Sequence, residues 1–164
     1  MAVAAVETPK VAIVPPSARG VDVEIRRFEL PDMDRHATWF MPRFVKEFPH
    51  LNDRQAIGFL RGVLYSNEFC FLYQDHGVAL AQTVNAHTLQ YEPIIWERFV
   101  WVEDSSNQKQ LEAASHFYTH FGTWAKRQGI KIVHVDEKTD VPLDLIQARL
   151  GKVNVTEQKY ARVT

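Results

Sequence analysis

The sequence predicts one α/β domain of the α+β kind, built on a mixed central sheet. Two observations predict this fold. Period-2 alternation of apolar and polar residues, typical of strands, recurs in several segments, and helical periodicity separates them. A long predicted helix also leads at once into another strand, an order that favours a parallel crossover. The expected order is a strand, two helices, a three-strand meander, a helix, a strand, a short helix and a last strand.

The chain is long enough for one core. It has 164 residues, of which 46% are hydrophobic and 12% are aromatic, and a chain of this length usually forms a single domain. The first segment, MAVAAVETPKVAIVPPSARG, is rich in Ala, Val and Pro, and Pro15 and Pro16 exclude a regular helix there. We therefore expect residues 1–20 to form an extended arm and residues 21–164 to form the domain.

The domain should begin with a strand and two helices. The segment VDVEIRRFEL, residues 21–30, alternates apolar and charged residues, which indicates a half-buried strand. Pro31 suits the first position of a helix, and Pro42 lies inside the same apolar pattern, where it should kink that helix. A second helix should follow Asn52, a favourable N-cap residue.

A meander of three strands should come next. EFCFLYQ and VALAQTV, residues 68–74 and 78–84, flank a DHG turn in which Asp75 and Gly77 suit a tight reversal. PIIWERFVWVE, residues 93–103, is the most hydrophobic segment of the chain. Because it is apolar on both faces, we expect it to be a central strand.

The rest of the domain should alternate helices and strands. NQKQLEAASHFYTHFGTWAKRQG, residues 107–129, has helical periodicity throughout, and IKIVHV, residues 130–135, should be a strand. LDLIQARLG follows Pro142 and predicts a short helix. A last strand is expected from Val153 to Val163.

The charge balance argues against nucleic acid and membranes as partners. The chain has 19 Lys and Arg against 20 Asp and Glu, a formal charge of -1, and no run of like charge that would follow a phosphate backbone. No segment approaches the roughly 20 apolar residues that a membrane-spanning helix needs. The single cysteine, Cys70, excludes an intrachain disulfide and suits a reducing compartment, so we expect a cytoplasmic protein.

The order of elements resembles the GNAT N-acetyltransferase fold over residues 21–163. Within it, PIIWERFVWVEDSS leading into HFYTHFGTWAKRQGIKIVHV and IQARLGKV looks like the small GNAT-like proteins that tailed bacteriophages encode near their structural genes. The resemblance implies a mixed central sheet with helices on both faces and a splayed pair of strands, the fourth and the fifth. It also implies acetyl-CoA as the cofactor of an active protein and a place in the host cytoplasm or in the virion.

By resemblance, acetyl-CoA would bind the edge of the fourth strand and the start of the next helix. The pantetheine arm would bind the strand edge, and the pyrophosphate would bind backbone amides in the first helical turn. The strand-edge positions are Phe99, Val100, Trp101 and Val102. The loop positions, aligned through TWAKRQG, are Lys109, Gln110, Leu111, Glu112, Ala113 and Ala114.

Glu112 stands where the resemblance requires a glycine. A side chain there obstructs the approach of the pyrophosphate to the backbone. A carboxylate about 4 Å from a phosphate charge also repels it by roughly 4 kcal/mol at an effective dielectric constant near 20. Acidic residues are favoured in the first turn of any helix. The loop therefore predicts a helix that has kept its packing role and lost its cofactor role, although Lys109 keeps a cation and Ala114 keeps a small residue.

The catalytic positions that the resemblance implies are incompletely filled. Glu97, in WERF on the fourth strand, stands where many relatives carry a general base, but a solvent-facing residue paired with Arg98 would show the same pattern. Gln147 stands where many relatives carry a tyrosine that protonates the departing thiolate, and glutamine cannot act as a general acid near neutral pH. Tyr160 lies far along the last strand, so we do not assign that role to it.

Three residues spaced four apart on the long helix have a spacing that can hold zinc. Glu112, His116 and His120 would share one helical face. The apolar stripe of this helix leaves them on its polar side, so we expect a solvated face and no metal. His134 and Asp136 alternate along a strand, and neither has a recognisable partner in the sequence.

Two functions of different classes follow from these observations. The first is a GNAT-fold module with weak or no catalysis, which contacts a protein partner through its arm and its aromatic surface and forms part of a bacteriophage particle. Four Trp, ten Phe and five Tyr are more than the inner faces of a small sheet commonly require. If Trp101 and Phe99 fill the strand splay, acetyl-CoA cannot enter.

The second function is an acetyl-CoA-dependent N-acetyltransferase that acts on an amine. The complete order of fold elements supports it, as do Lys109, Ala114 and Glu97. An open cleft between the fourth and fifth strands would favour the enzyme, and a filled cleft would favour the module, which is the interpretation we prefer.

Overall fold

The computed structural model describes residues 24–84, 93–135, 139–151, 153–155 and 159–162. The predicted arm lies outside these residues, so its conformation stays a prediction. No helix within the described residues is both long enough and apolar enough to cross a membrane.

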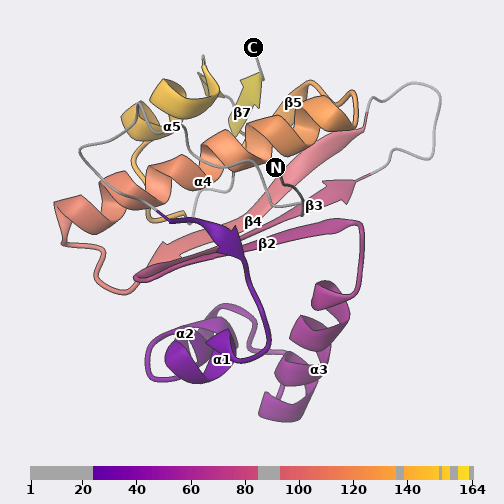
Figure 1. Ribbon diagram of the computed structural model, residues 1–164, viewed down its shortest axis with the longest axis vertical. Coiled ribbons are helices and arrows are strands. Elements are labelled where there is room, and N and C mark those ends of the chain that lie inside the picture. Colours follow the sequence, from indigo (N-terminus) through magenta and orange to yellow (C-terminus); the bar gives the residue numbers. More distant parts are fainter. Residues whose placement is uncertain (1–23, 85–92, 136–138, 152, 156–158, 163–164) are drawn as a thin grey trace, which may run out of the picture.

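Within the described residues, seven strands form one mixed sheet in the order β1-β2-β3-β4-β5-β7-β6 (Figure 1). The first four strands pair antiparallel in sequence order, and β5 then joins β4 in parallel. The predicted mixed sheet with a central fourth strand is therefore confirmed. The strands are β1 (Arg26–Arg27), β2 (Phe69–Gln74), β3 (Gly77–Val84), β4 (Ile94–Val102), β5 (Ile132–Val135), β6 (Val153–Val155) and β7 (Lys159–Arg162).

Helices cover both faces of the sheet, as predicted. Three helices lie on one face, and a long helix crosses the other face with a short helix beside it (Figure 1). The first group is α1 (Asp32–Arg35), α2 (Phe40–Glu47) and α3 (Asp53–Leu64), and the second is α4 (Gln108–Arg127) and α5 (Leu143–Leu150). The predicted cap of α3 is present, because Asn52 and Gln55 form a reciprocal capping box.

The β2–β3 hairpin closes through a two-residue turn, Asp75 and His76, because Gln74 pairs with Gly77. Gly77 itself belongs to β3 and not to the turn. A Cβ atom at this position would lie 3.2 Å from the carbonyl oxygen of Trp101 and 3.0 Å from the Gln74 side chain. Glycine is therefore favoured here, because any side chain would force Gln74 and the neighbouring strand to move by a few tenths of an ångström.

A bulge in β4 decides which face each of its residues meets. Leu80 pairs with Phe99 while Ala81 pairs with Glu97, so Arg98 is an extra residue in the strand. Before the bulge, Glu97 reaches a side chain of α4. After the bulge, Val100 belongs to the core under α4 and Phe99 belongs to the core on the opposite face. The one-residue shift thus reverses the alternation of the strand.

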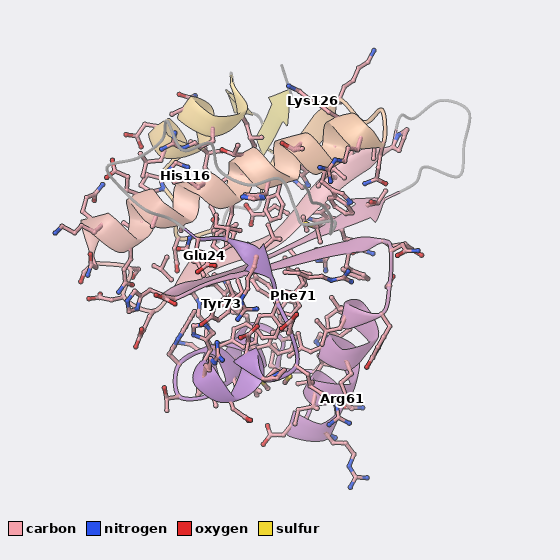
Figure 2. All side chains as sticks on the ribbon, viewed as in Figure 1. Glu24, Arg61, Phe71, Tyr73, His116 and Lys126 are labelled. Carbon is pink, nitrogen blue, oxygen red and sulfur yellow. The ribbon has the colours of Figure 1, made fainter. Side chains whose placement is uncertain are left out.

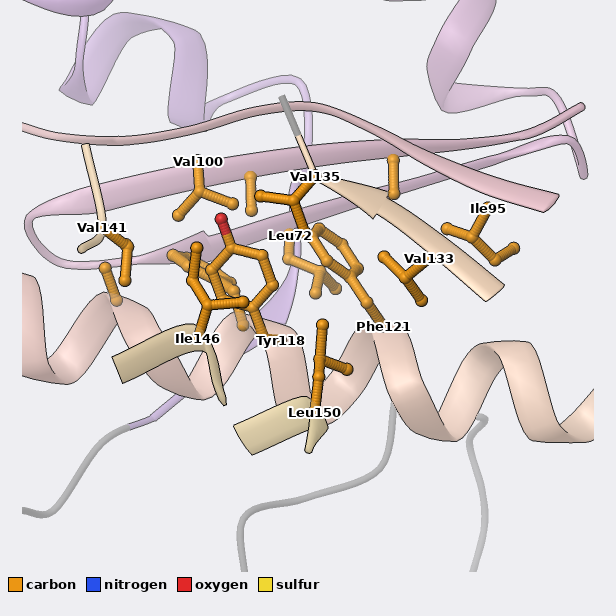
Figure 3. Packing of buried hydrophobic residues seen from close by; sticks show 14 of the residues in the cluster. Leu72, Ile95, Val100, Tyr118, Phe121, Val133, Val135, Val141, Ile146 and Leu150 are labelled. Carbon is orange, nitrogen blue, oxygen red and sulfur yellow. The ribbon is translucent and has the colours of Figure 1, made fainter. Parts of the chain in front are cut away.

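The two faces bury different kinds of side chain. The α4 face is mainly aliphatic (Figure 3), and the face under α1 to α3 is mainly aromatic. Phe99 and Trp101 stack with ring centroids 4.1 Å apart inside the aromatic core. The idea that these two rings fill the strand splay is therefore wrong. The aromatic core consists chiefly of Phe28, Phe40, Phe44, Phe71, Tyr73, Phe99 and Trp101.

The pairing of β4 with β5 is short and leaves the two strands splayed. Among the residues that the structure describes, two pairs join them, Ile95 with Val133 and Trp96 with His134. β4 continues to Val102 beyond this pairing. Beyond this pairing, no strand within the described part of the chain covers the edge of β4.

Three predicted elements differ from the structure. The helix expected after Pro31 is divided into α1 and α2, because the ring of Pro42 would clash with the carbonyl group four residues earlier if one helix ran through. The strand expected over residues 21–30 has only Arg26–Arg27 in the sheet, and residues 21–23 lie outside the described part. The single last strand is two antiparallel strands, β6 and β7. Between them the sequence TEQ carries none of the Gly, Pro or Asn residues that usually signal a turn.

Candidate acyl-CoA site

The first turn of α4 is capped by the chain itself. The side-chain oxygen of Asn107 accepts hydrogen bonds from the amides of Lys109 and Gln110 at 3.0 and 3.3 Å. The amide of Leu111 donates to the carbonyl oxygen of Asn107 at 3.1 Å. These first-turn amides are the groups that would bind an anion at a helix N-terminus. At this helix they already have acceptors.

The six predicted loop residues do not converge on one site. Gln110 accepts a hydrogen bond from the Asp104 amide at 2.8 Å, and the Ala113 carbonyl accepts one from Gln74 at 3.2 Å. Glu112, the expected obstacle, is exposed, but it is the fifth residue of α4, and the first turn of this helix contains no acidic residue, so the expected first-turn position is wrong. Of the other loop residues, Lys109 is exposed, and Leu111 and Ala114 are buried in the core.

The open edge of β4 is occupied by residues that follow β5. The carbonyl oxygen of Val100 accepts hydrogen bonds from the Asp140 amide at 3.1 Å and from the Thr139 hydroxyl at 3.3 Å. The amide of Val102 donates to Oδ2 of Asp140 at 2.9 Å. This is the strand edge on which the resemblance places the pantetheine arm. We call Thr139–Asp140, with its bonds to β4, the edge plug.

Arg43 of α2 forms an ion pair with Asp140 of the edge plug. Its two terminal nitrogens donate to the two carboxylate oxygens of Asp140 at 2.7 and 2.8 Å. The guanidinium lies 4.5 Å from the ring centroid of Trp101. The Asp140 side chain is only 10% exposed, so this bidentate pair is largely shielded from water. The plug is therefore fixed by a charged contact as well as by the backbone.

Glu97, the predicted general base, is fully buried in the sheet. The Tyr118 hydroxyl on α4 donates to Oε1 of Glu97 at 2.7 Å and lies 2.9 Å from Oγ1 of Thr139. Figure 3 shows this hydroxyl extending from α4 toward Val100. The alternative that Glu97 faces solvent beside Arg98 is wrong, because its side chain has no exposed surface. Its catalytic role stays a prediction.

Tyr118 is a polar residue of the site that sequence reasoning missed. It stands one residue after Phe117 in an apolar run of α4 and reads as a core aromatic, which it also is. The only signal was its hydroxyl group, because a buried tyrosine usually has a hydrogen-bond partner. Gln147, placed by resemblance at the acid position, is exposed on α5. The Tyr160 side chain and Asp136 lie outside the described residues. The His134 ring lies beside Trp96, tilted by 38°, with ring centroids 5.5 Å apart.

The expectation of a solvated face for His116 and His120 is wrong. Their exposed fractions are 6% and 1%, because α4 is covered on more than one side. Arg149 of α5 places a guanidinium nitrogen 3.3 Å from Nε2 of His116 and donates to the Ser115 hydroxyl at 3.1 Å. Burial, and then the Arg149 charge, lower the pKa of His116. The described residues contain no group of three His, Cys, Asp or Glu side chains that could hold a metal ion.

The described residues do not fit acetyl-CoA in this conformation. The strand edge that would bind pantetheine is bonded to the edge plug. The first-turn amides that would bind pyrophosphate are bonded to Asn107. A carboxylate, Glu112, stands where the resemblance requires a glycine. Each part of the expected cofactor site is thus closed by a different group.

Comparison with known proteins identifies the fold. No protein-family model and no curated protein matches the sequence. Among solved structures, the aminoglycoside acetyltransferase meta-AAC0020 from an uncultured soil metagenomic sample, in complex with sisomicin, is 17% identical, with a TM-score of 0.56 and coverage of 82% of this chain and 90% of that chain. Aminoglycoside 6'-N-acetyltransferase AAC(6')-IG from Acinetobacter haemolyticus is 13% identical, with a TM-score of 0.52 and coverage of 81% and 92%.

A third similar structure is a putative acetyltransferase from Staphylococcus aureus Mu50. It is 12% identical, with a TM-score of 0.51 and coverage of 84% of this chain and 96% of that chain. Likeness at this level of identity shows the GNAT fold alone. The resemblance to phage-encoded proteins gains no support from these structures, which come from bacteria and a soil sample.

Proposed function

We propose that this GNAT-fold chain is an interaction module with weak or no acetyl transfer, because its own residues close the acyl-CoA groove. The observation that carries the proposal is the edge plug. Asp140 supplies β4 with one amide donor and one carboxylate acceptor, which are the two kinds of group that a bound pantetheine would supply. A ligand would have to break these bonds and the Arg43 ion pair before it could bind.

The proposed partner is a protein. The last turns of α3 and the residue after it expose apolar side chains: Phe59 is 42% exposed and Tyr65 is 87% exposed. Exposed aromatic residues of this kind are typical of protein contacts. The predicted arm, residues 1–20, is the second proposed contact. Removing the arm and replacing Tyr65 with Ser should each weaken capture of the partner from an extract of the source, whereas Lys131→Ser should not.

A place in a bacteriophage particle is the finer form of this proposal, and it rests on the sequence resemblance alone. The same resemblance is the basis for the proposed location of the protein, which is the host cytoplasm or the virion. Mass spectrometry of purified particles tests it. The chain should be present at a fixed ratio to the major structural proteins, and its absence from particles of the encoding virus would remove this part of the proposal.

An acetyl-CoA-dependent N-acetyltransferase is the second candidate. The similar solved structures support it more than they support the module, since those proteins are named as acetyltransferases. The buried Glu97–Tyr118 hydrogen bond supports it as well, because a carboxylate and a phenol stand next to the splayed strands. The closed groove opposes it, so this candidate requires a second conformation in which Thr139 and Asp140 leave β4.

Calorimetric titration with acetyl-CoA separates the two candidates. We expect no binding by the parent chain, partial recovery of binding in Asp140→Ala and fuller recovery when Glu112→Gly is added to it, while the control Asp144→Ala stays inert. Asp144 is exposed on α5 and makes no hydrogen bond or ion pair among the described residues. Tight binding by the parent, followed by transfer of an acetyl group to an amine, would overturn the module and establish the enzyme.

A further inference from the structure

A second polar region lies away from the acyl-CoA site. A cavity of about 170 Å³ opens between the start of β2, Arg27 of β1 and the C-terminal half of α4. None of its lining residues belongs to β4, to α5 or to the edge plug. The polar and aromatic side chains that line it are Arg27, Asn67, His120, Thr123, Trp124 and Arg127. The cavity is therefore separate from the expected acyl-CoA site at β4 and the start of α4.

The cavity is positively charged. Arg27 and Arg127 both line it, and its lining includes no Asp or Glu. Neither arginine forms an ion pair with any acidic residue that the structure describes, although Arg27 donates one hydrogen bond to the Leu64 carbonyl at 3.0 Å. Both arginines are exposed to solvent, and both lie near enough to Cys70 for their charges to lower the pKa of its thiol, which burial raises. Two cations at one cavity without a carboxylate favour an anion and disfavour a metal ion.

His120 adds an unused hydrogen-bonding group to the same cavity. Its side chain is 1% exposed, and within the described part of the chain neither ring nitrogen has a hydrogen-bond partner. Burial, and then the charges of His116 and Arg127, lower the pKa of His120 to about 4. The ring is therefore neutral at pH 7 and carries one N–H donor and one acceptor. Buried polar groups without partners are uncommon in native proteins and require an explanation.

We propose that this cavity binds a small molecule with an oxyanion head, a carboxylate or a phosphate. Arg27 and Arg127 pair with the negative oxygens, because a guanidinium matches both groups with two parallel N–H donors. His120 donates its N–H to a third lone pair, and Trp124 offers an apolar wall. The volume suits such a ligand, since a cavity of about 150 Å³ holds a molecule as large as benzene.

Titration of the full chain with two probes tests the proposal. Inorganic phosphate represents a free oxyanion, and benzoate represents a carboxylate with an apolar body; we expect at least one to bind in a saturable manner. Arg127→Gln should weaken that binding about tenfold or more, because it removes a charge-assisted pair. The matched control is Lys126→Gln, which removes the same charge from the neighbouring exposed position at the end of α4 (Figure 2). It should leave the affinity unchanged.

The His120 ring gives a second readout that surface binding cannot reproduce. An anion next to this ring stabilises its protonated form, so the ligand should raise the pKa of His120, measured by NMR of the imidazole nitrogens. Arg27→Gln should abolish the same shift; if its lost bond to Leu64 prevents folding, Arg127→Gln alone decides the matter. Binding of neither probe, equal weakening by Lys126→Gln and Arg127→Gln, or an unchanged His120 pKa would overturn the proposal. Acetyl-CoA binding has no part in these outcomes.

Discussion

The two polar regions beside α4 differ in how completely their groups are paired. At the edge of β4, Asp140 serves Val100, Val102 and Arg43 at once, and its carboxylate uses both oxygens. In the cavity beside β2, the His120 ring has no partner among the described residues and Arg127 has no described ion-pair partner. The polar groups at the edge of β4 are thus paired within the chain, whereas the cavity contains hydrogen-bonding groups that no described residue pairs.

This difference bears on how readily each region could accept a ligand. A fully paired polar network stabilises one conformation and disfavours a competing ligand, because the ligand must replace every bond that it breaks. At an incompletely paired region a ligand breaks no bond within the chain and supplies the missing partner of a buried group, at the cost of removing water from the exposed arginines. The GNAT fold implies a ligand site at β4, but the buried side chain without a described partner, His120, lies in the cavity beside β2.

The largest effect is expected at the edge plug. Asp140→Ala leaves the Arg43 guanidinium and the Val102 amide without their acceptor, and breaking a largely buried ion pair from one side costs about 3 kcal/mol. The free energy of unfolding, measured by urea denaturation, should fall by this amount. The control Asp144→Ala should change it by less than about 1 kcal/mol, the usual limit for a helix-terminal charge. Equal effects of the two changes would show that the plug contributes no stability.

The pH dependence of stability tests the second region. The pKa of His120 is about 4 in the folded chain against 6.5 ordinarily, so the unfolded chain binds this proton more tightly. The contribution of His120 is therefore complete above about pH 6.5 and is lost as the pH falls toward 4. At pH 5 the loss should be about 2 kcal/mol relative to pH 7.

His120→Gln isolates this contribution, because His36 and His116 also have lowered pKa values and add to the total. Urea denaturation of both proteins at pH 5 and pH 7 should show a smaller pH difference in the variant. The same difference in both would mean that the ring does not resist protonation, and the cavity would then be better hydrated than its geometry implies. Saturating phosphate should reduce the pH difference of the parent.

The sequence predicted the elements of the sheet but not the contacts that close the groove. Local signals were sufficient for Asn52, Asn107 and Pro142, because a helix start depends on the residues next to it. The ion pair of Arg43 with Asp140 joins positions 97 residues apart. No local pattern marks such a pair, since either residue alone looks like an ordinary surface charge.

The burial of His120 shows why the apolar stripe of α4 gave a wrong prediction for the two histidines. The stripe correctly placed Phe117 and Phe121 in the core. It assigned the histidines to solvent because one helix face was assumed to be buried, whereas Arg149 of α5 covers His116, and Arg27 of β1 lies at the cavity beside His120. Only the tertiary arrangement shows that α4 is enclosed on further sides. The bulge at Arg98 was hidden for a related reason: β4 is apolar on both faces, so its alternation does not reveal a shift of one residue.

A smaller effect is expected at Tyr118. Tyr118→Phe keeps the ring in the core and removes the donor to the buried Glu97 carboxyl, at a cost of about 1 to 2 kcal/mol in unfolding free energy. Tyr65→Phe is the matched control, because the Tyr65 side chain is 87% exposed and should cost less than about 0.5 kcal/mol. If Tyr118→Phe were neutral, Glu97 would be held by its other contacts, and the phenol would be available for another role.

The smallest effect is expected at the cap of α4, and it sharpens the comparison most directly. Asn107→Ala should cost about 1 kcal/mol, and Asn107→Gly only a few tenths, because glycine also suits this position. The glycine variant frees the amides of Lys109 and Gln110 while the fold stays intact.

If the Asn107 cap is what closes the pyrophosphate site, this variant combined with Glu112→Gly should gain measurable affinity for pyrophosphate by calorimetry. Asn52→Gly, the same change at α3, should gain none. If the parent chain already bound pyrophosphate at α4, the ligand would displace the Asn107 cap. Both regions would then bind anions, and they would differ only in affinity.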